Sequence, residues 1–235
     1  GLIDEFAIDC ELKTGNLHVA SSAQAGEDLA REAEQLAERY GYDQLRYVPP
    51  AELPEWTSAQ GMHGGLMDYG ARHLHPLNYA LGLAAAAHEL GAELHEDSRV
   101  LDYREDTAVH VRTARGTVKA RYLVLACNGY LEKLEKRCAG RIMPINNYML
   151  ATEPLPEATA RRLIRDDASM SDTRFVINYW KLSADNRLLF GGGETYTRTF
   201  PADIKAFVRP YMLKIYPELE DVTSSTAGAG PSPSP

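Results

Sequence analysis

The segment Ala126-Cys127-Asn128-Gly129 holds the residues best suited to meet a ligand, because small residues let a bound molecule approach the backbone. It follows Tyr122–Ala126, an unbroken apolar run that predicts a strand buried on both faces of a parallel sheet. Open α/β sheets bind ligands at the carboxyl ends of such strands. The residues alone favour an ordinary turn between strand and loop, with a cofactor contact as the alternative.

A second small-residue segment, Gly191-Gly192-Gly193, could approach a ligand in the same way. It lacks the GK[ST] ending and the following helix that give a phosphate-binding loop its mechanics. The segment therefore predicts the end of a strand that is kept free of side chains. Two interpretations stay open at this point: clearance for a flat cofactor ring, or a β-bulge.

Histidines and cysteines offer other kinds of chemistry. His73 and His75 would point the same way on a strand, with Asp68 nearby, but no third ligand or CxxC pair supports a zinc site. Capping or packing is the favoured role for both histidines, and we predict no metal site. Cys127 would need a neighbouring base and a lowered pKa to act as a nucleophile, so an inert buried thiol is favoured.

Three aromatic residues, Tyr148, Tyr179 and Trp180, stand on predicted strands. Core packing is the favoured role for each of them taken singly. Alternation over 175–182 places Tyr179 on one face of its strand and Trp180 on the other. An aromatic wall attracts alkylammonium groups through cation–π contact worth about 0.5–2 kcal/mol. A ring that faces a ligand would therefore suit a cationic amine.

Local patterns predict the elements that must position these residues. Alternating residues predict a hairpin within 7–20 and strands over 93–95, 100–105, 108–113, 118–120, 144–152, 175–182 and 187–191. Caps and apolar stripes predict helices over 22–40, 76–90, 130–137, 156–165 and 201–216. The glycine-rich segment 61–70 is expected to cross between domains. The tail, residues 223–235, is rich in Ser, Gly and Pro and is expected to be disordered.

Composition bounds the class of protein. The 235 residues carry 25 Lys and Arg against 33 Asp and Glu, a formal charge of −8 with the two signs interspersed. Nucleic-acid binding usually needs a basic patch, so it is not expected. Three cysteines without a pairing framework suit a reducing cytoplasm. No apolar run approaches the roughly 20 residues that span a bilayer, so no membrane contact is expected.

The order and spacing of several blocks resemble the D-amino-acid oxidase family of FAD-dependent flavoproteins. The match is closest to its amine oxidoreductases of the gamma-glutamylputrescine oxidase type and covers about residues 1–222. The blocks that carry the resemblance are Ile8–Cys10, Gly65–Ala87, Glu93–Tyr130, Arg141–Leu155 and Arg187–Tyr196. The family also opens with a strand–GxGxxG–helix unit, and this sequence contains no such motif.

This resemblance implies a mixed α/β fold, with part of an FAD-binding Rossmann-like domain and an antiparallel-sheet substrate domain. Residues 1–60 would form a mixed segment with a substrate-side hairpin and a helix. Residues 61–140 would form the FAD-domain segment that lacks GxGxxG. Residues 141–222 would form the substrate-domain sheet and helices, and 223–235 the disordered tail.

The resemblance also implies the chemistry. FAD would take a hydride from the carbon next to the nitrogen of gamma-glutamylputrescine or a related amine or amino acid. The imine would hydrolyse to an aldehyde, and oxygen would yield hydrogen peroxide. We assign no catalytic residue. The implied substrate contacts are Tyr148 and Tyr179, and the implied FAD contacts are Val100, Ala126, Cys127, Asn128, Gly129, Gly191 and Gly192.

Two rival functions stay open. Leu189 occupies the place of a lysine that assists the reaction with oxygen in related oxidases, so a dehydrogenase with another electron acceptor is the first rival. Because the glycine motif is absent, the second rival is a non-catalytic fragment that binds no flavin. The expected partner is a small-molecule amine, with no nucleic acid and no membrane, and the oligomeric state stays open.

Overall fold

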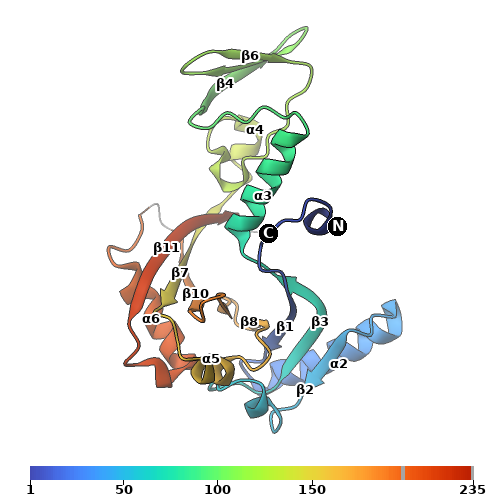
Figure 1. The fold of residues 1–235 in the computed structure, drawn as a ribbon, viewed down its shortest axis with the longest axis vertical. Coiled ribbons are helices and arrows are strands. Elements are labelled where there is room, and N and C mark those ends of the chain that lie inside the picture. The colour runs from blue at the N-terminus through green and yellow to red at the C-terminus, as the bar shows by residue number, and fades with distance from the viewer. Residues whose placement is uncertain (197–198, 234–235) are drawn as a thin grey trace.

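The structure is a computed structural model that describes residues 1–196 and 199–233 (Figure 1). It is a mixed α/β fold with one eight-stranded sheet, in the order β11-β7-β10-β9-β8-β1-β3-β2, and a separate sheet in the order β4-β5-β6. β1 and β8 run parallel, whereas the other paired strands are antiparallel. The mixed α/β class predicted from the sequence is confirmed.

The elements have the following bounds. The large sheet consists of β1 (Lys13–Val19), β2 (Leu45–Val48), β3 (Gly65–His73), β7 (Pro144–Thr152), β8 (Ser169–Asp172), β9 (Tyr179–Leu182), β10 (Leu188–Thr195) and β11 (Ser224–Pro233). The small sheet consists of β4 (Val100–Glu105), β5 (Val109–Thr113) and β6 (Thr117–Ala120). The α-helices are α1 (Leu2–Glu5), α2 (Ala23–Tyr40), α3 (Pro76–Glu89), α4 (Lys136–Ala139), α5 (Glu157–Leu163) and α6 (Ile204–Ile215). The 3-10 turns are η1 (Leu53–Glu55), η2 (Asn128–Leu131) and η3 (Pro217–Leu219).

One face of the large sheet carries the main core. Helix α6 lies along its outer side next to β7 and β11 (Figure 1). Trp180 is buried there, stacked on Phe190 at 5.5 Å between ring centroids, and its indole N–H donates to the Tyr216 hydroxyl at 2.9 Å. Every second residue of β8 and β9 points into this core, which is why these two strands alternate buried and half-buried side chains; β10 does so only over Leu188–Phe190.

Several elements follow their local signals as predicted. Ser22 caps α2 by accepting a hydrogen bond from the Ala25 N–H at 3.2 Å, and Gly41 ends the helix in the left-handed conformation at φ 62°. Strands β4, β5 and β6 form where alternation predicts them. No helix in the described part of the chain is long and apolar enough to cross a membrane.

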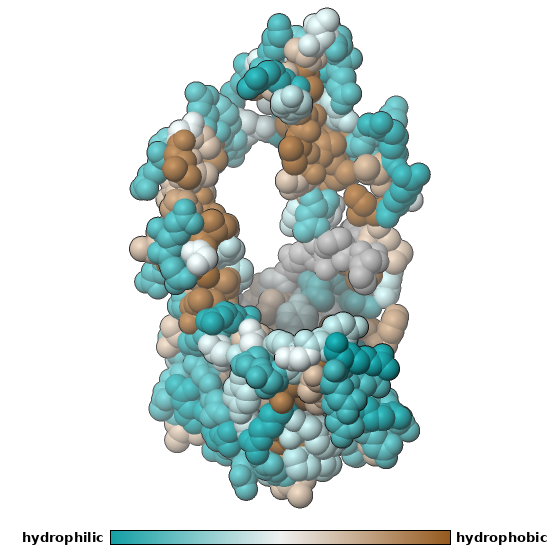
Figure 2. Space-filling view, turned by 90° about the vertical axis from the view of Figure 1, so that its right-hand side faces the viewer, coloured by the Kyte–Doolittle hydropathy of each residue, from teal (hydrophilic) through white to brown (hydrophobic). Residues whose placement is uncertain are grey.

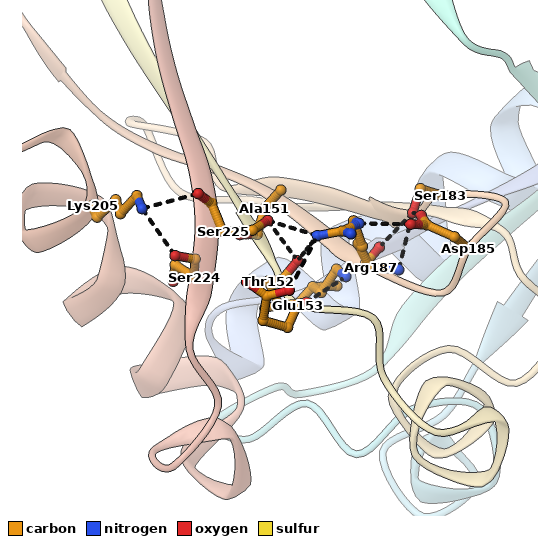
Figure 3. A network of polar contacts seen from close by, with 10 residues as sticks. Ala151, Thr152, Glu153, Ser183, Asp185, Arg187, Lys205, Ser224 and Ser225 are labelled. Atoms are coloured by element: carbon orange, nitrogen blue, oxygen red, sulfur yellow. Dashed lines mark hydrogen bonds and ion pairs between the residues drawn. The ribbon is translucent and has the colours of Figure 1, made fainter.

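The predicted disorder of the tail is wrong for residues 224–233, which form β11 antiparallel to β7; residues 234 and 235 lie outside the described part. Arg187 holds this strand, as Figure 3 shows: its guanidinium donates to the Thr152 carbonyl at 3.2 Å and to the Ser225 hydroxyl at 2.7 Å. Lys205 of α6 donates to the carbonyls of Ser224 and Ser225 at 3.0 and 3.1 Å. Backbone pairing and these two cations replace the apolar contacts that the tail cannot make.

The predicted buried strand Tyr122–Ala126 is also wrong, because the segment is irregular and the side chains of Tyr122 and Val124 are 83% and 84% exposed. The predicted strand over 93–95 does not form either. A strand buried on both faces needs neighbouring strands, and no described residue pairs with either segment. Figure 2 shows an opening through the molecule, with hydrophobic residues along its left side and at its upper right.

Three further differences concern the large sheet. The predicted hairpin within 7–20 is instead one strand, β1, that pairs with β3. β3 itself occupies most of the segment expected to cross between domains, so it belongs with β1 rather than with a cofactor segment that starts at residue 61. The strand predicted over 175–182 forms only from Tyr179 onward, because the preceding loop folds around the buried carboxylate of Asp172, which accepts from the Asn178 N–H at 3.1 Å.

Candidate functional site on the open face of the large sheet

The large sheet has a second face that α6 does not cover. We call it the open face, defined by the half-buried side chains of His18, Asn147, Ser171, Tyr179 and Leu189. Helix α2 borders this face at β3, where Leu66 packs with Leu29. Because the opposite face is filled by the core, the open face is the side of the sheet that is left to meet a ligand.

Tyr179 is the best-positioned aromatic residue of the open face. Its hydroxyl donates a hydrogen bond to the Asn147 side-chain oxygen on β7. Burial raises the pKa of the phenol, so the group stays protonated at neutral pH. A substituent at Gly191 would lie 2.3 Å from two atoms of the Tyr179 ring, so only glycine leaves room for the ring. Tyr179 therefore lies directly beside the glycine run.

The glycine run itself combines a bulge with close packing. The β10–β7 register shifts between Gly191 and Glu194, which marks a bulge. Gly192 faces the other side of the sheet, where an added Cβ would lie 2.6 Å from the Asn178 side-chain oxygen. Gly193 adopts φ 72°, a conformation that favours glycine. In this structure the room at Gly191 is filled by Tyr179.

Tyr148, the other implied substrate contact, lies on the opposite face of the sheet from Tyr179. Tyr148 is fully buried on the covered face, with its ring 4.9 Å from that of Phe207 between centroids. Its hydroxyl bonds to Thr195 at 2.5 Å. Successive residues of β7 point to opposite faces, so Asn147 lies on the open face and Tyr148 does not. Tyr148 is a core residue in this structure, and Asn147 takes the place beside Tyr179.

The remaining predicted cofactor residues lie together, next to the small sheet. Val100 and Cys127 line one hollow with Leu101, Leu123 and Leu125. Asn128 lines an adjoining hollow, Ala126 is exposed, and Gly129 is half-buried. The structure therefore separates the seven predicted cofactor residues into one group here and a second group, Gly191 and Gly192, in the large sheet.

The hollow at Val100 can be tested for its fit to FAD. Its walls are largely apolar, which suits a flat adenine ring, and its charged lining residues are Arg99, Lys133 and Lys136 together with Asp102 and Glu132, of which Glu132 is paired with Arg99 at 2.7 Å. The ammonium groups of Lys133 and Lys136 suit the pyrophosphate. Val100 and Cys127 would hold the nucleotide end of the cofactor there. The described residues fit that part of FAD.

A polar cluster that the sequence did not predict lies next to β3. Lys13 is paired with Asp167 at 2.6 Å, and His73 Nε2 lies 2.9 Å from the Asp167 carbonyl. The Lys181 ammonium donates to the Leu74 carbonyl at 2.7 Å. Burial lowers the pKa of both His73 and Lys181. His73 thus packs in the interior, and packing is one of the two roles, capping or packing, that the sequence favours for it.

His75 takes the other favoured role. Its Nδ1 accepts a hydrogen bond from the Asn78 N–H at 3.2 Å, which caps α3. Within residues 1–196 and 199–233, no cluster of three or more His, Cys, Asp or Glu side chains could hold a metal ion. Cys127 is half-buried and forms no disulfide.

His18 is a second residue that sequence reasoning missed. Its Nδ1 lies 2.7 Å from the Ser171 hydroxyl, which joins β1 to β8 across the open face. Burial is the main influence on the imidazole and lowers its pKa, so the ring is neutral at pH 7. The alternation of Leu17 and Val19 with His18 was the signal that could have placed it opposite the core.

Comparison with known proteins assigns the family. A family model described as "FAD dependent oxidoreductase" matches residues 1–235. The chain is 37% identical to a probable oxidoreductase OrdL of Rhizobium meliloti over 98% of this chain and 54% of that protein. It is also 37% identical to gamma-glutamylputrescine oxidoreductase of Escherichia coli over 94% of this chain and 52% of that protein.

The fold agrees with this assignment. The crystal structure of glycine oxidase from Geobacillus kaustophilus superposes with a TM-score of 0.81 at 21% identity, over 99% of this chain and 62% of that one. The chain spans about half the length of the curated relatives that it matches. FAD is the cofactor of this family. The chain therefore belongs to the FAD-dependent oxidoreductases of the D-amino-acid oxidase family.

Proposed function

We propose that the protein oxidises the C–N bond of gamma-glutamylputrescine or a related amine, giving an imine that hydrolyses to an aldehyde. The 37% identity to the Escherichia coli enzyme over 94% of this chain is the observation that carries the proposal. FAD, when bound, accepts the hydride from the carbon next to nitrogen. The protein's own part is to bind the amine, orient its C–H bond and exclude water.

Tyr179 is the residue to which we assign amine binding. Its ring is half-buried on the open face, and its hydroxyl is fixed by Asn147. A fixed aromatic face attracts an alkylammonium group with about 0.5–2 kcal/mol. Because the phenol keeps its proton, the hydroxyl stays neutral and adds no charge that would hold the amine too firmly.

Oxygen is the electron acceptor that we favour, with hydrogen peroxide as the product. Leu189 favours the alternative, a dehydrogenase, because it stands where related oxidases carry a lysine. However, Lys181 pairs directly with Leu189 across β9 and β10, so a lysine side chain lies on the same face of the neighbouring strand, with its ammonium bonded to the Leu74 carbonyl. Burial lowers its pKa, as expected for an ammonium in a partly desolvated site.

A cytoplasmic location and a small-molecule partner complete the proposal. Support for the location comes from three cysteines that are free in the structure, Cys10, Cys127 and Cys138. Such free thiols suit a reducing compartment.

The test begins with protein whose mass has been verified and which has been incubated with FAD. After removal of free flavin, an absorbance spectrum shows whether flavin is retained. Anaerobic mixing with gamma-glutamylputrescine should bleach the flavin, and admitting air should restore the colour with formation of peroxide. Bleaching that only a quinone dye reverses would favour the dehydrogenase. Protein that retains no flavin would support the non-catalytic alternative.

Variants of Tyr179 test the amine site itself. Tyr179→Ala should slow flavin reduction or weaken amine binding by roughly tenfold, equivalent to about 1.4 kcal/mol, with unchanged FAD content. Tyr40→Ala is the matched control, because Tyr40 is 75% exposed at the end of α2. Equal rates and affinities in the wild type and Tyr179→Ala would remove Tyr179 from the proposal.

A further inference from the structure

One row of side chains crosses the open face from β1 to β7. From β1 through β8, β9 and β10 to β7, the residues of this row are His18, Ser171, Tyr179, Gly191 and Met149. Neighbouring strands lie about 4.8 Å apart, so His18 stands two strands, or roughly 10 Å, from Tyr179. The row therefore extends the proposed amine site in one direction along the sheet, toward α2.

The His18 end of the row is built to form hydrogen bonds without carrying a charge. His18 and Ser171 are bonded to each other at 2.7 Å, and both are half-buried. Burial outweighs the nearby acids and lowers the pKa of His18, so the imidazole offers one donor and one acceptor at neutral pH. Paired in this way, the two side chains are held in position before any ligand binds.

Two acids act on this end of the row. Glu32 on α2 and Asp172 at the end of β8 both act on the His18 imidazole through their charges. Asp172 is itself paired with Arg174, so the exposed Glu32 is the less compensated of the two. The charge of Glu32 disfavours a free carboxylate at this end and favours an ammonium group, and it discriminates little against a neutral amide.

We propose that His18 and Ser171 form a subsite for a second polar group of an extended amine substrate. This proposal rests on the proposed function. That group is an amide or an ammonium about 10 Å from the amine that Tyr179 holds. The substrate class is thus a long diamine or an acylated diamine, laid across the strands with its reacting end at Tyr179. Simple short monoamines would fill only half of the row.

The first test follows the His18 imidazole directly by NMR and does not depend on turnover. The protein has seven histidines, and the NMR signals of His18 are identified as those that disappear in the His18→Gln variant. Gamma-glutamylputrescine should shift the His18 signals and leave those of the other histidines in place. Butylamine, which has the amine but no second polar group, should leave His18 unchanged. Absence of any His18 shift at saturating gamma-glutamylputrescine would overturn the subsite.

The second test compares affinities. His18→Phe and Ser171→Ala should weaken binding of gamma-glutamylputrescine at least fivefold and change butylamine binding less than twofold. N-glutarylputrescine, which keeps the amide but replaces the zwitterion with a carboxylate alone, should bind more weakly than gamma-glutamylputrescine. Asn16→Ala is the matched control, because it removes a comparable hydrogen bond to Ser169, of 2.9 Å, from the same two strands. Thermal unfolding shows whether each variant is folded.

The outcomes separate this proposal from the proposed function. If gamma-glutamylputrescine bleaches the flavin but the His18 and Ser171 variants bind it normally, the subsite is wrong and the amine oxidation stands. If no amine bleaches the flavin while the His18 signals still respond to gamma-glutamylputrescine, the subsite stands as a binding site and the oxidation is wrong. An equal loss of affinity in Asn16→Ala would also count against the assignment to His18.

Discussion

Gly191→Ala should destabilise the fold through a clash between the new methyl group and the Tyr179 ring. The added methyl carbon would lie 2.3 Å from Cε2 and Cζ of Tyr179 and 2.7 Å from its hydroxyl oxygen. Ordinary contact begins near 3.4 Å, so the ring must retreat by about 1 Å. A ring moved that far loses its hydrogen bond to Asn147.

The magnitude follows from these two effects. Overpacking costs about 1–3 kcal/mol, and a lost side-chain hydrogen bond costs about 0.5–1.5 kcal/mol. The free energy of unfolding should therefore fall by about 1.5–4.5 kcal/mol. For a chain of this size, each kcal/mol lowers the melting temperature by about 2–4 °C. Urea unfolding followed by circular dichroism measures the change.

A control and a double variant make this measurement decisive. Gly140→Ala adds the same methyl group where no atom lies within 4 Å, at φ −80°, and should change stability by less than about 0.5 kcal/mol. Tyr179→Ala should relieve most of the clash, so Gly191→Ala should cost at least about 1 kcal/mol less in that background. Equal costs of Gly191→Ala in both backgrounds would refute the reasoning.

Three other predictions concern stability. Trp180→Phe removes the indole bond to Tyr216 and leaves a cavity in the core; we expect a loss of about 2–3 kcal/mol by urea unfolding, with amine affinity unchanged. Burial lowers the pKa of His73 below its ordinary 6.5, so the unfolded chain takes up a proton first as the pH falls. The stability from neutral His73 is present above about pH 6.5 and is lost below it; His73→Gln should flatten the pH dependence between 7.5 and 5, and an unchanged slope would contradict this. Deleting residues 227–235 removes most of β11 and should lower the melting temperature by several degrees, and an unchanged melting temperature would show that the strand adds nothing.

Local chemistry explains which parts of the fold could be predicted from the sequence. Helix α2 has a serine cap, an apolar stripe and a glycine stop, and each of these acts within one or two turns. Strands β4 to β6 alternate and are joined by short turns, so they too are specified by near neighbours. For such elements the sequence pattern and the structure agree because few distant residues are involved.

Distant pairing explains what could not be predicted. β11 has almost no apolar side chains, and it forms because β7 offers a free edge and Arg187 and Lys205 stand beside it. Tyr122–Ala126 has the opposite problem, since its strong strand composition finds no partner among the described residues. At the site, alternation placed Tyr179 correctly, whereas the face of Tyr148 depended on which side α6 covers.

β11 also has a consequence for the behaviour of the protein at high concentration. It forms one outer edge of the eight-stranded sheet. Exposed edges invite strands from other molecules, and proline blunts such edges because it has no N–H to donate. Pro231 and Pro233 have no N–H to donate, and the glycines and serines that precede them in β11 have little tendency to pair with another strand. A segment that contributes little packing thus protects the large sheet against edge-to-edge aggregation.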